Sequence, residues 1–408
     1  MKIALFTNEF PPNIYGGAGV HIDFLSHELS KLGHVEVRCF GNQTEELRGM
    51  HVQGIQSSLN KMEDPGNSHI KMFHNLSRNV EMSQHTQEAD IIHCHTWYTH
   101  LAGIFSRELL QVPLILTTHS LETHRPWKVE QLGNGYFLSR WIEHHAYNTA
   151  DGVIAVSQQM KTDVVEAYGI QPEKVTVIHN GIDPEFYSPT FDNALLQEYG
   201  INPEIPFVLF VGRITRQKGI SQLIATAKYF NKNCQVVLCA GAPDTPEIAR
   251  ETEALISDLQ ASREGVILIS EMLPREKIKV LYSHARVFAC PSLYEPFGII
   301  NLEAMSCETA VVASSVGGIP EIIQEDITGN LIPLESVSRT DFNPKDPVSF
   351  QMNFAAKINR LLDDESLAIA MGKAGRKRVL EKFSWESIAK TTFQYYQEVI
   401  SKFEKEKA

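Results

Sequence analysis

Residues 286–314, RVFACPSLYEPFGIINLEAMSCETAVVAS, run from an apolar strand through a turn into a short helix. Glu295 and Glu303 lie eight residues apart in this stretch, and Gly298 between them marks the expected start of the helix. The first N–H groups of a helix are unpaired and favour anions, so the turn is a candidate site for a sugar phosphate. The backbone groups in question are those of Phe297, Gly298 and Ile299.

The two glutamates have different expected positions. Glu295 precedes the helix, whereas Glu303 lies on its second turn and could accept hydrogen bonds from ribose hydroxyls. A carboxylate on a helix more often simply faces solvent. Neither glutamate therefore identifies a site by itself.

A second group of charges follows the strand FVLFVG, residues 207–212. Arg213 comes next, and Lys218 follows five residues later in the turn between strand and helix. Both side chains could converge on one diphosphate, since arginine offers a planar fork and lysine a compact charge. The alternative is a solvated loop that happens to carry three cations.

Short β-branched or apolar runs alternate with longer amphipathic segments along the whole chain. This alternation is typical of parallel sheets covered by helices on both faces, so we expect an α/β fold. The expected strands are KIALFT, VEVRCF, DIIHC, LILTT, GVIAV and KVTVIH in the first half, and FVLFVG, QVVLCA, GVILI, RVFACP, AVVAS and NLIPL in the second. Two such series predict two Rossmann-like domains, divided in residues 183–207, where Pro, Asn and Asp collect. The tail after residue 384 is predicted to be one long helix, and the polar residues 44–70 predict no definite structure.

Length and charge limit the class of protein. The 408 residues exceed what one hydrophobic core usually serves, and the net charge of −12 argues against a nucleic-acid partner, which needs a basic surface. The apolar start is too short for a signal peptide, and no run of about 18 apolar residues could span a bilayer. We therefore expect a cytoplasmic protein without membrane insertion. The six cysteines form no C-x-x-C pair and are expected to be buried thiols.

A glycine-rich loop follows the first strand, with Gly16, Gly17 and Gly19 ahead of a helix. Glycines there let the backbone approach a phosphate closely. A dinucleotide fingerprint would need a third glycine where Ile22 stands, so an enzyme of hydride transfer is not favoured. A tight turn that serves packing alone is the other interpretation.

Taken together, these motifs resemble the retaining glycosyltransferases of the GT-B fold, and among them the glycogen synthase branch. The resemblance is most specific in GRxxxxKG, residues 212–219, and PSxxEPxG, residues 291–298. Matching segments run from near the N-terminus to about residue 325, and FSWESIA, residues 383–389, extends the match into the tail. The other matching segments are NEFPPNIYGGAGVH, HCHTWYTHLAG, THSLETHRPWKVEQLGNGY, VIAVS, VIHNGID, VLCAGAPDTPEIA, EMLPREKI and VVASSVGGIPEII.

The resemblance implies two Rossmann-like domains with a cleft between them and a C-terminal helix that crosses back to the first domain. In this chain, residues 1–190 would form the acceptor domain, completed by helix 384–405. Residues 191–383 would form the domain that binds the nucleotide-sugar donor.

The resemblance also assigns roles in the second domain. Arg213 and Lys218 would grip the donor diphosphate and stabilise charge on the leaving group, which is usually the largest catalytic contribution. Glu295 would hydrogen-bond the hydroxyls of the donor glucose, and Glu303 those of the ribose.

In the first domain, His119 and Asn180 would reach the glucose, and Gly16 and Gly17 would let the backbone approach the phosphates. Without the family context, a histidine that follows a strand is more often a structural hydrogen-bonding residue. His119 therefore depends on the resemblance for its catalytic role.

The reaction implied is transfer of glucose from ADP-glucose to the non-reducing end of an α-1,4-glucan with retention of configuration. The leaving phosphate would help to deprotonate the acceptor, since the sequence identifies no carboxylate nucleophile beneath the sugar ring. No metal or other cofactor is expected, because no D-x-D occurs and Arg213 and Lys218 supply the positive charge. His93 and His95 alternate onto one strand face, but no third metal ligand is evident nearby in the sequence.

Two positions depart from the classical glycogen and starch synthases. Ile14 stands where they have a lysine, and Thr96 where they have an acidic residue. These differences point to shorter synthases, some of them similar to α-maltose-1-phosphate synthases, which place glucose on glucose 1-phosphate. Arg125, Trp127 and Lys128 could bind such an anionic acceptor, stack against a glucan, or serve only structure.

Proteins of other classes share the architecture. A catalytically silent glucan-binding protein on this fold is disfavoured because the charged residues Arg213, Lys218, Glu295 and Glu303 are all present. A two-domain sugar-nucleotide epimerase is disfavoured by the long series of synthase-like segments. The choice of ADP over UDP rests on family likeness alone.

Overall fold

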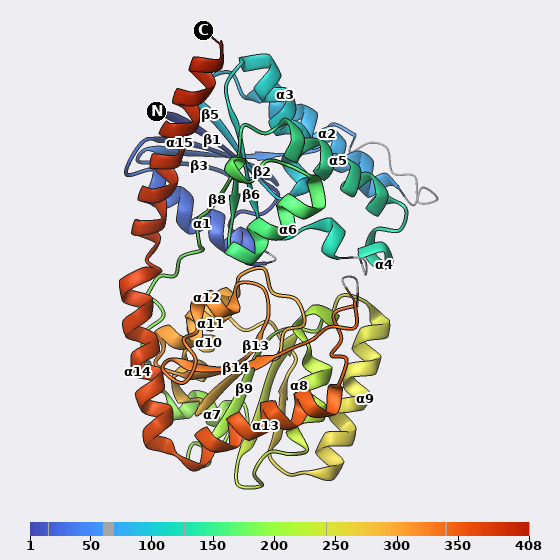
Figure 1. Cartoon of the computed structure of the whole chain (residues 1–408), viewed down its shortest axis with the longest axis vertical. Helices are drawn as coiled ribbons and strands as arrows, with labels where there is room; N and C mark the ends of the chain where they lie inside the picture. Colours follow the sequence, from blue (N-terminus) through green and yellow to red (C-terminus); the bar gives the residue numbers. More distant parts are fainter. Residues whose placement is uncertain (15, 60–68, 126–127, 242, 339–340, 408) are drawn as a thin grey trace. The chain divides into compact units, whose positions relative to one another are not determined.

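The computed structural model describes residues 1–14, 16–59, 69–125, 128–241, 243–338 and 341–407. Over these residues the chain forms two compact α/β units (Figure 1). Unit 1 comprises Met1–Gly181 and Trp385–Ala408, and unit 2 comprises Ile182–Ser384. The division after Gly181 precedes the boundary expected after residue 190.

Unit 1 is built on a sheet of eight described strands in the order β3-β4-β2-β1-β5-β6-β7-β8. All neighbouring strands are parallel except β3 and β4. The strands are β1 (Lys2–Thr7), β2 (His34–Phe40), β3 (Thr44–Leu47), β4 (Met50–Ile55), β5 (Ile91–His95), β6 (Leu114–Thr118), β7 (Gly152–Ala155) and β8 (Val175–Val177). All six strands expected in the first half are confirmed. Strands β3 and β4 lie in residues 44–70, where no structure was predicted, and residues 60–68 of that stretch are outside the described residues.

Helices cover this sheet, and the last one comes from the end of the chain. They are α1 (Gly17–Leu29), α2 (Ile70–His85), α3 (His100–Leu110), α4 (Lys128–Leu132), α5 (Gly135–Thr149), α6 (Gln158–Tyr168) and α15 (Trp385–Lys407). Helix α15 packs beside α1 (Figure 1). Its buried residues Trp385, Ile388, Tyr396 and Val399 join the same apolar core as Ile22 of α1. Their spacing of three, eight and three residues keeps them on one helix face.

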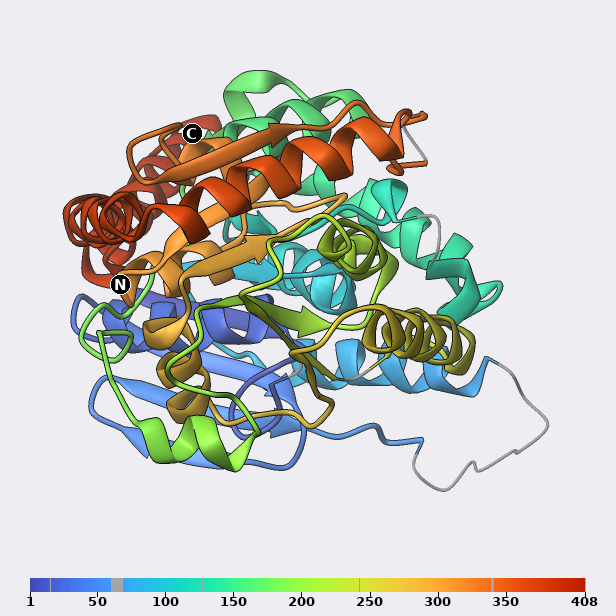
Figure 2. The ribbon, with the colours of Figure 1, turned by 90° about the horizontal axis from the view of Figure 1, so that it is seen from below.

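Unit 2 is built on a parallel sheet of six described strands in the order β11-β10-β9-β12-β13-β14. The strands are β9 (Phe207–Arg213), β10 (Gln235–Gly241), β11 (Val266–Ile269), β12 (Val287–Cys290), β13 (Ala310–Ser315) and β14 (Gly329–Pro333), so all six expected in the second half are confirmed. The helices are α7 (Asn193–Glu198), α8 (Ile220–Ala227), α9 (Pro246–Ser262), α10 (Arg275–His284), α11 (Ile299–Ser306), α12 (Ile319–Ile322), α13 (Pro347–Asp363) and α14 (Glu365–Lys382). Helix α13 runs alongside β14 in both views (Figures 1 and 2).

Short polar side chains fix where several helices begin. Asp192, Thr245, Asp346 and Asp364 each accept a hydrogen bond from a backbone N–H in the first turn of α7, α9, α13 and α14. A cap of this kind stabilises a helix by about 1 kcal/mol. Of these four helices, α9 follows its strand, β10, by a short turn, and such turns at the carboxyl ends of parallel strands are where ligands bind in α/β folds.

Two composition-based expectations can be compared with the structure. All six cysteines are buried and unpaired, as predicted. Within the described residues, no helix combines the length and the apolar character that crossing a membrane requires.

Candidate functional site

In unit 2, Arg213 is the last residue of β9, and its guanidinium is held by an acidic partner. Nη1 of Arg213 lies 2.9 Å from Oδ1 of Asp244, which is mostly buried. Asp244 follows β10, the neighbouring strand, so the sheet itself brings the two residues together. Sequence analysis missed Asp244; its only signal was its place in the family-like segment VLCAGAPDTPEIA.

Lys218 lies on the other side of the same turn. Its Nζ is 2.7 Å from Oε2 of Glu295, and Ser292 Oγ donates to the same oxygen at 3.2 Å. The structure thus brings together two residues that the sequence placed in separate motifs. Both side chains are largely shielded, with 19% of Lys218 and 8% of Glu295 exposed, so their charges act in a medium less polar than water.

Gly219 explains how the two turns approach so closely. Its φ is +64°, and a Cβ there would lie 2.0 Å from the carbonyl oxygen of Pro291. Nearby, the N–H of Leu293 donates to the carbonyl of Gln217 at 2.8 Å. Only glycine combines this backbone conformation with this contact.

The turn before α11 has the geometry that its sequence predicted. Gly298 has φ of +105° and precedes the first helical residue, Ile299, while Phe297 is buried. The chain after β13 braces it, because the N–H of Gly318 donates to the carbonyl of Glu295 at 3.1 Å. A Cβ on Gly317 would lie 1.8 Å from that same carbonyl oxygen.

Glu303 on α11 is held by two tyrosines that sequence analysis did not single out. Tyr187 OH donates to Oε1 at 3.1 Å, and Tyr282 OH donates to Oε2 at 3.0 Å. Burial raises the pKa of Glu303, and the two hydroxyls oppose that rise. Each oxygen keeps a second lone pair, so the carboxylate can still accept a ligand hydroxyl.

In unit 1, the glycine loop is tied to the first strand by Glu9. The N–H of Gly16 donates to Oε2 of Glu9 at 2.8 Å, and a Cβ on Gly19 would lie 2.8 Å from the same atom. Nothing lies within 4 Å of the position that a Cβ on Gly16 would take. Gly17 is the first residue of α1. Gly19 is thus closely packed against the side chains of Glu9 and Ile14, whereas the space at Gly16 fits the close approach expected of a ligand.

His119 follows β6 directly and lies in a group of buried histidines. Its Nε2 is 2.9 Å from Nδ1 of His95, the last residue of β5. His93 is occupied elsewhere: its Nδ1 lies 2.6 Å from Tyr396 OH and its Nε2 lies 2.6 Å from Thr117 Oγ1. The rings of His93 and His95 lie side by side, with centroids 4.1 Å apart, but both ring nitrogens of His93 already have hydrogen-bond partners.

His21 is a residue that sequence analysis missed. It extends from α1, and its Nδ1 is 2.7 Å from Oδ1 of Asn180, one of the predicted glucose-binding residues. Its ring lies edge-on to that of His119, with centroids 4.7 Å apart. The available signal was its place in the glycine-loop segment GGAGVH.

Thr96 and Ile14, the two departures from the classical synthases, both have structural contacts in unit 1. Thr96 Oγ1 donates to Asn8 Oδ1 at 2.7 Å. Its φ of +66° is unusual for a β-branched residue and indicates local backbone strain between β5 and the next turn. Ile14 lies close to Gly19, 3.1 Å from the position that its Cβ would take.

Of the three residues considered for acceptor binding, Trp127 lies outside the described residues, and Lys128 begins α4. Arg125 is part of the packing: its Nη1 is 3.1 Å from Ser120 Oγ and 4.0 Å from Oε1 of Glu122, which is buried. These contacts agree with the structural role that was one of the interpretations of Arg125.

A buried carboxylate pair supports this loop and yields a prediction about pH. Oε2 of Glu143 accepts from the N–H of Glu122 at 2.8 Å and from the hydroxyl of Tyr168. Burial, and next the charge of Glu122, raise the pKa of Glu143 to about 8. Between its ordinary value near 4.5 and 8, folded Glu143 keeps a proton that the unfolded chain releases, so stability falls as pH rises through this window.

Glu143→Gln is expected to remove much of this pH dependence, because glutamine carries no ionisable proton. Urea unfolding is measured at pH 5 and at pH 9. Between these two pH values, the free energy of unfolding of the wild type should fall by on the order of a few kcal/mol more than that of the variant. Glu166→Gln, at an exposed position of α6, is the control and should follow the wild type. Parallel profiles for wild type and Glu143→Gln would contradict the prediction.

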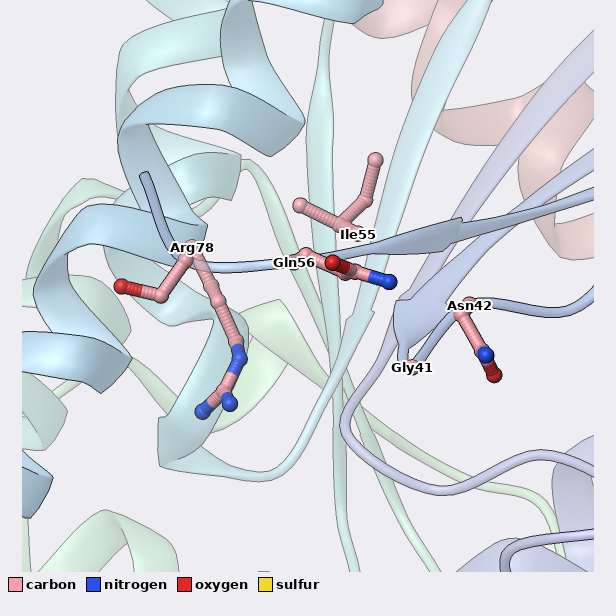
Figure 3. A pocket seen from close by; sticks show the side chains of 6 residues that line it. Gly41, Asn42, Ile55, Gln56 and Arg78 are labelled. Atoms are coloured by element: carbon pink, nitrogen blue, oxygen red, sulfur yellow. The ribbon is translucent and has the colours of Figure 1, made fainter. Parts of the chain in front are cut away.

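A polar hollow of about 220 Å³ lies where β2 and β4 end (Figure 3). It is lined by Gly41, Asn42, Ile55, Gln56, Ser57 and Arg78. The guanidinium of Arg78 lies over the ring of Phe40, 5.1 Å from its centroid, and burial lowers the pKa of Arg78. A guanidinium among amide and hydroxyl groups suits a small anion. This basic residue was not singled out from the sequence.

Comparison with known proteins gives the same fold and adds a family. The profile described as Glycosyltransferase Family 4 matches residues 15–186, and that described as Glycosyl transferases group 1 matches residues 192–341. The α-maltose-1-phosphate synthase of Mycolicibacterium smegmatis is 44% identical over 403 residues, covering 98% of this chain and 100% of the relative. The enzyme of the same name from Mycobacterium tuberculosis H37Rv is 42% identical with the same coverage.

A solved structure supports the architecture. Sucrose-phosphate synthase from Thermosynechococcus elongatus superposes with a TM-score of 0.78 and 24% identity, over 98% of this chain and 99% of that chain. Full-length identity above 40% together with two matched glycosyltransferase profiles shows the family. The chain therefore belongs to the GT-B glycosyltransferases, in the group of the α-maltose-1-phosphate synthase type.

Proposed function

We propose that the protein transfers glucose from ADP-glucose to glucose 1-phosphate and so forms α-maltose 1-phosphate. The observation that carries this proposal is the 44% identity over the full length of an enzyme with that activity in its name. It favours the acceptor that was the alternative in the sequence analysis over the glucan that was the leading expectation. Ile14 and Thr96, the two departures from the classical synthases, point in the same direction.

In the proposed reaction, the bond from the glucose anomeric carbon to the diphosphate breaks, and a bond to a hydroxyl oxygen of glucose 1-phosphate forms on the same face. The hydroxyl proton passes to the leaving phosphate. Arg213 and Lys218 neutralise the negative charge that develops on this phosphate. We assign to these two residues the largest contribution to the rate enhancement. Asp244 and Glu295 keep the two cations oriented before the donor binds.

Other predicted residues would position the donor. The backbone from Phe297 to Ile299 would hold phosphate oxygens, and Glu303 would accept a hydrogen bond from ribose. His119 and Asn180 would contact glucose hydroxyls. We propose that no metal takes part, so activity should survive a chelator that removes divalent ions.

The acceptor is tested by incubating the protein and ADP-glucose with glucose 1-phosphate or glycogen in separate reactions. We expect ADP and a phosphorylated disaccharide in equal amounts with the first acceptor, and no chain growth with the second. A parallel reaction with UDP-glucose tests the choice of base. Growth of glycogen with no disaccharide phosphate would reject the proposal in favour of a glucan synthase.

A further inference from the structure

Three histidines of unit 1 come together at the carboxyl ends of its central strands. His21, His95 and His119 each offer a ring nitrogen, and these atoms lie within 4.8 Å of one another. His95 ends β5, His119 follows β6, and His21 reaches them from α1. His21 and His95 are buried, whereas His119 is partly exposed.

Hydrogen bonding fixes the tautomer of His21. Asn180 Oδ1 can only accept, so Nδ1 of His21 carries the proton and donates at 2.7 Å. Its Nε2 is then a bare lone pair, buried and without a hydrogen bond to any described residue. Metal-binding histidines are oriented in just this way, with one ring nitrogen bound to a carbonyl oxygen and the other directed at the ion.

The other two rings are hydrogen-bonded to each other. His95 Nδ1 and His119 Nε2 lie 2.9 Å apart and share one proton, while Nε2 of His95 is also buried without a partner in the described part of the chain.

From this geometry we propose that His21, His95 and His119 bind one divalent transition-metal ion, such as Zn²⁺ or Co²⁺. Three imidazoles and one water form a common tetrahedral site, with metal–nitrogen distances near 2.0–2.1 Å. Nitrogens around such an ion are roughly 3.3 Å apart. The three nitrogens, which lie within 4.8 Å of one another, must therefore shift when the ion binds, and the 2.9 Å distance between His95 Nδ1 and His119 Nε2 must widen. One of the facing rings of His95 and His119 moves its proton to its other nitrogen, and no net proton is released.

A consequence for activity rests on the proposed function. A metal that occupies the lone pair of His119 denies that residue to the glucose of the donor, so the ion inhibits rather than assists. Zn²⁺ should raise the KM for ADP-glucose without lowering kcat, and a chelator should restore the original KM.

Binding itself is tested without any enzyme assay, by titrating the chelator-treated full-length protein with Co²⁺ alone. One equivalent should give the visible absorption bands of tetrahedral cobalt, and Zn²⁺ should abolish them. His21→Gln and His95→Gln should lose the bands. His100→Gln, at a buried histidine of α3 outside the three, is the matched control and should keep them.

Asn180→Ala leaves all three ligands in place but removes the carbonyl that orients His21, and should weaken Co²⁺ binding roughly 10–100-fold. This variant keeps the test valid if a histidine variant does not fold, as judged by circular dichroism. No stoichiometric uptake by the wild type, or equal uptake by folded His21→Gln, would overturn the proposal. If the protein forms no maltose 1-phosphate in the acceptor assay, the Co²⁺ titration still tests the metal site. The proposed function and the proposed metal site can therefore be rejected independently.

Discussion

Lys218→Ala is expected to lower kcat by roughly 10²–10³-fold, the size of effect seen when one preorganised charge or donor is removed from a transition state. The charge of Lys218 lies in a largely shielded turn, 2.7 Å from Glu295, and is aimed before the donor arrives. An interaction that strengthens only as the diphosphate leaves acts on kcat more than on KM. Steady-state rates of ADP release at saturating donor and acceptor measure it.

Two further variants separate charge from structure. Arg216→Ala removes a cation from the same turn, but Arg216 is half exposed and its partner is the exposed Glu251, so this variant should be near wild type. Lys218→Gln keeps a hydrogen-bond donor for the buried carboxylate of Glu295 and removes only the charge, so it should lose activity as Lys218→Ala does. Native circular dichroism with near-native turnover in either Lys218 variant would remove this residue from the mechanism.

Gly219→Ala is expected to destabilise unit 2 by roughly 2–5 kcal/mol. A left-handed conformation costs a residue with Cβ roughly 1–2 kcal/mol, and the Cβ would lie 2.0 Å from the carbonyl oxygen of Pro291, a backbone atom that cannot turn away. Overpacking of this kind typically adds roughly 1–3 kcal/mol. Because the displaced turns carry Lys218 and Glu295, activity should fall as well.

Gly200→Ala is the matched control for this substitution. Gly200 also belongs to unit 2 and has φ of +73°, but nothing lies within 4 Å of the position that its Cβ would take. Urea unfolding should therefore show only the conformational cost at Gly200 and both costs at Gly219. Equal losses of stability in the two variants would mean that the turn containing Pro291 moves away from the added Cβ at no cost. That outcome would contradict the prediction.

The sequence predicted the repeating framework well, for a physical reason. All twelve expected strands are confirmed because buried parallel strands are continuous runs of β-branched and apolar residues, such as Phe207–Arg213. Strands β3 and β4 were missed because strands at or beside the exposed edge of a sheet do not need a continuous run of apolar residues. The four residues of β3 are all exposed, and β4 hides only one face.

The sequence predicted only those parts of the site whose residues lie close together along the chain. Arg213, Lys218 and Glu295 stand in compact motifs, but the contact between Lys218 and Glu295 that the structure shows was not predicted. Their roles in binding a donor stay predictions. The partners that hold them come from elsewhere in the chain: Asp244 is 31 residues from Arg213, and Tyr187 is 116 residues from Glu303. A single sequence gives no way to pair such residues, because only the strand order sets them side by side.

The position of α15 in unit 1 has a consequence for how the protein is made. Tyr396 OH meets His93 Nδ1 across a separation of 303 residues, and Trp385 lies edge-on to His21. The ribosome therefore completes unit 2, which is continuous from Ile182 to Ser384, before it delivers the last piece of the unit that it began first. Domains commonly fold in the order of their synthesis, but here the sheet of unit 1 keeps an open apolar face until residues 385–407 have been made. A chain that stops a few turns early would retain every residue of unit 2 and still leave unit 1 without its final helix.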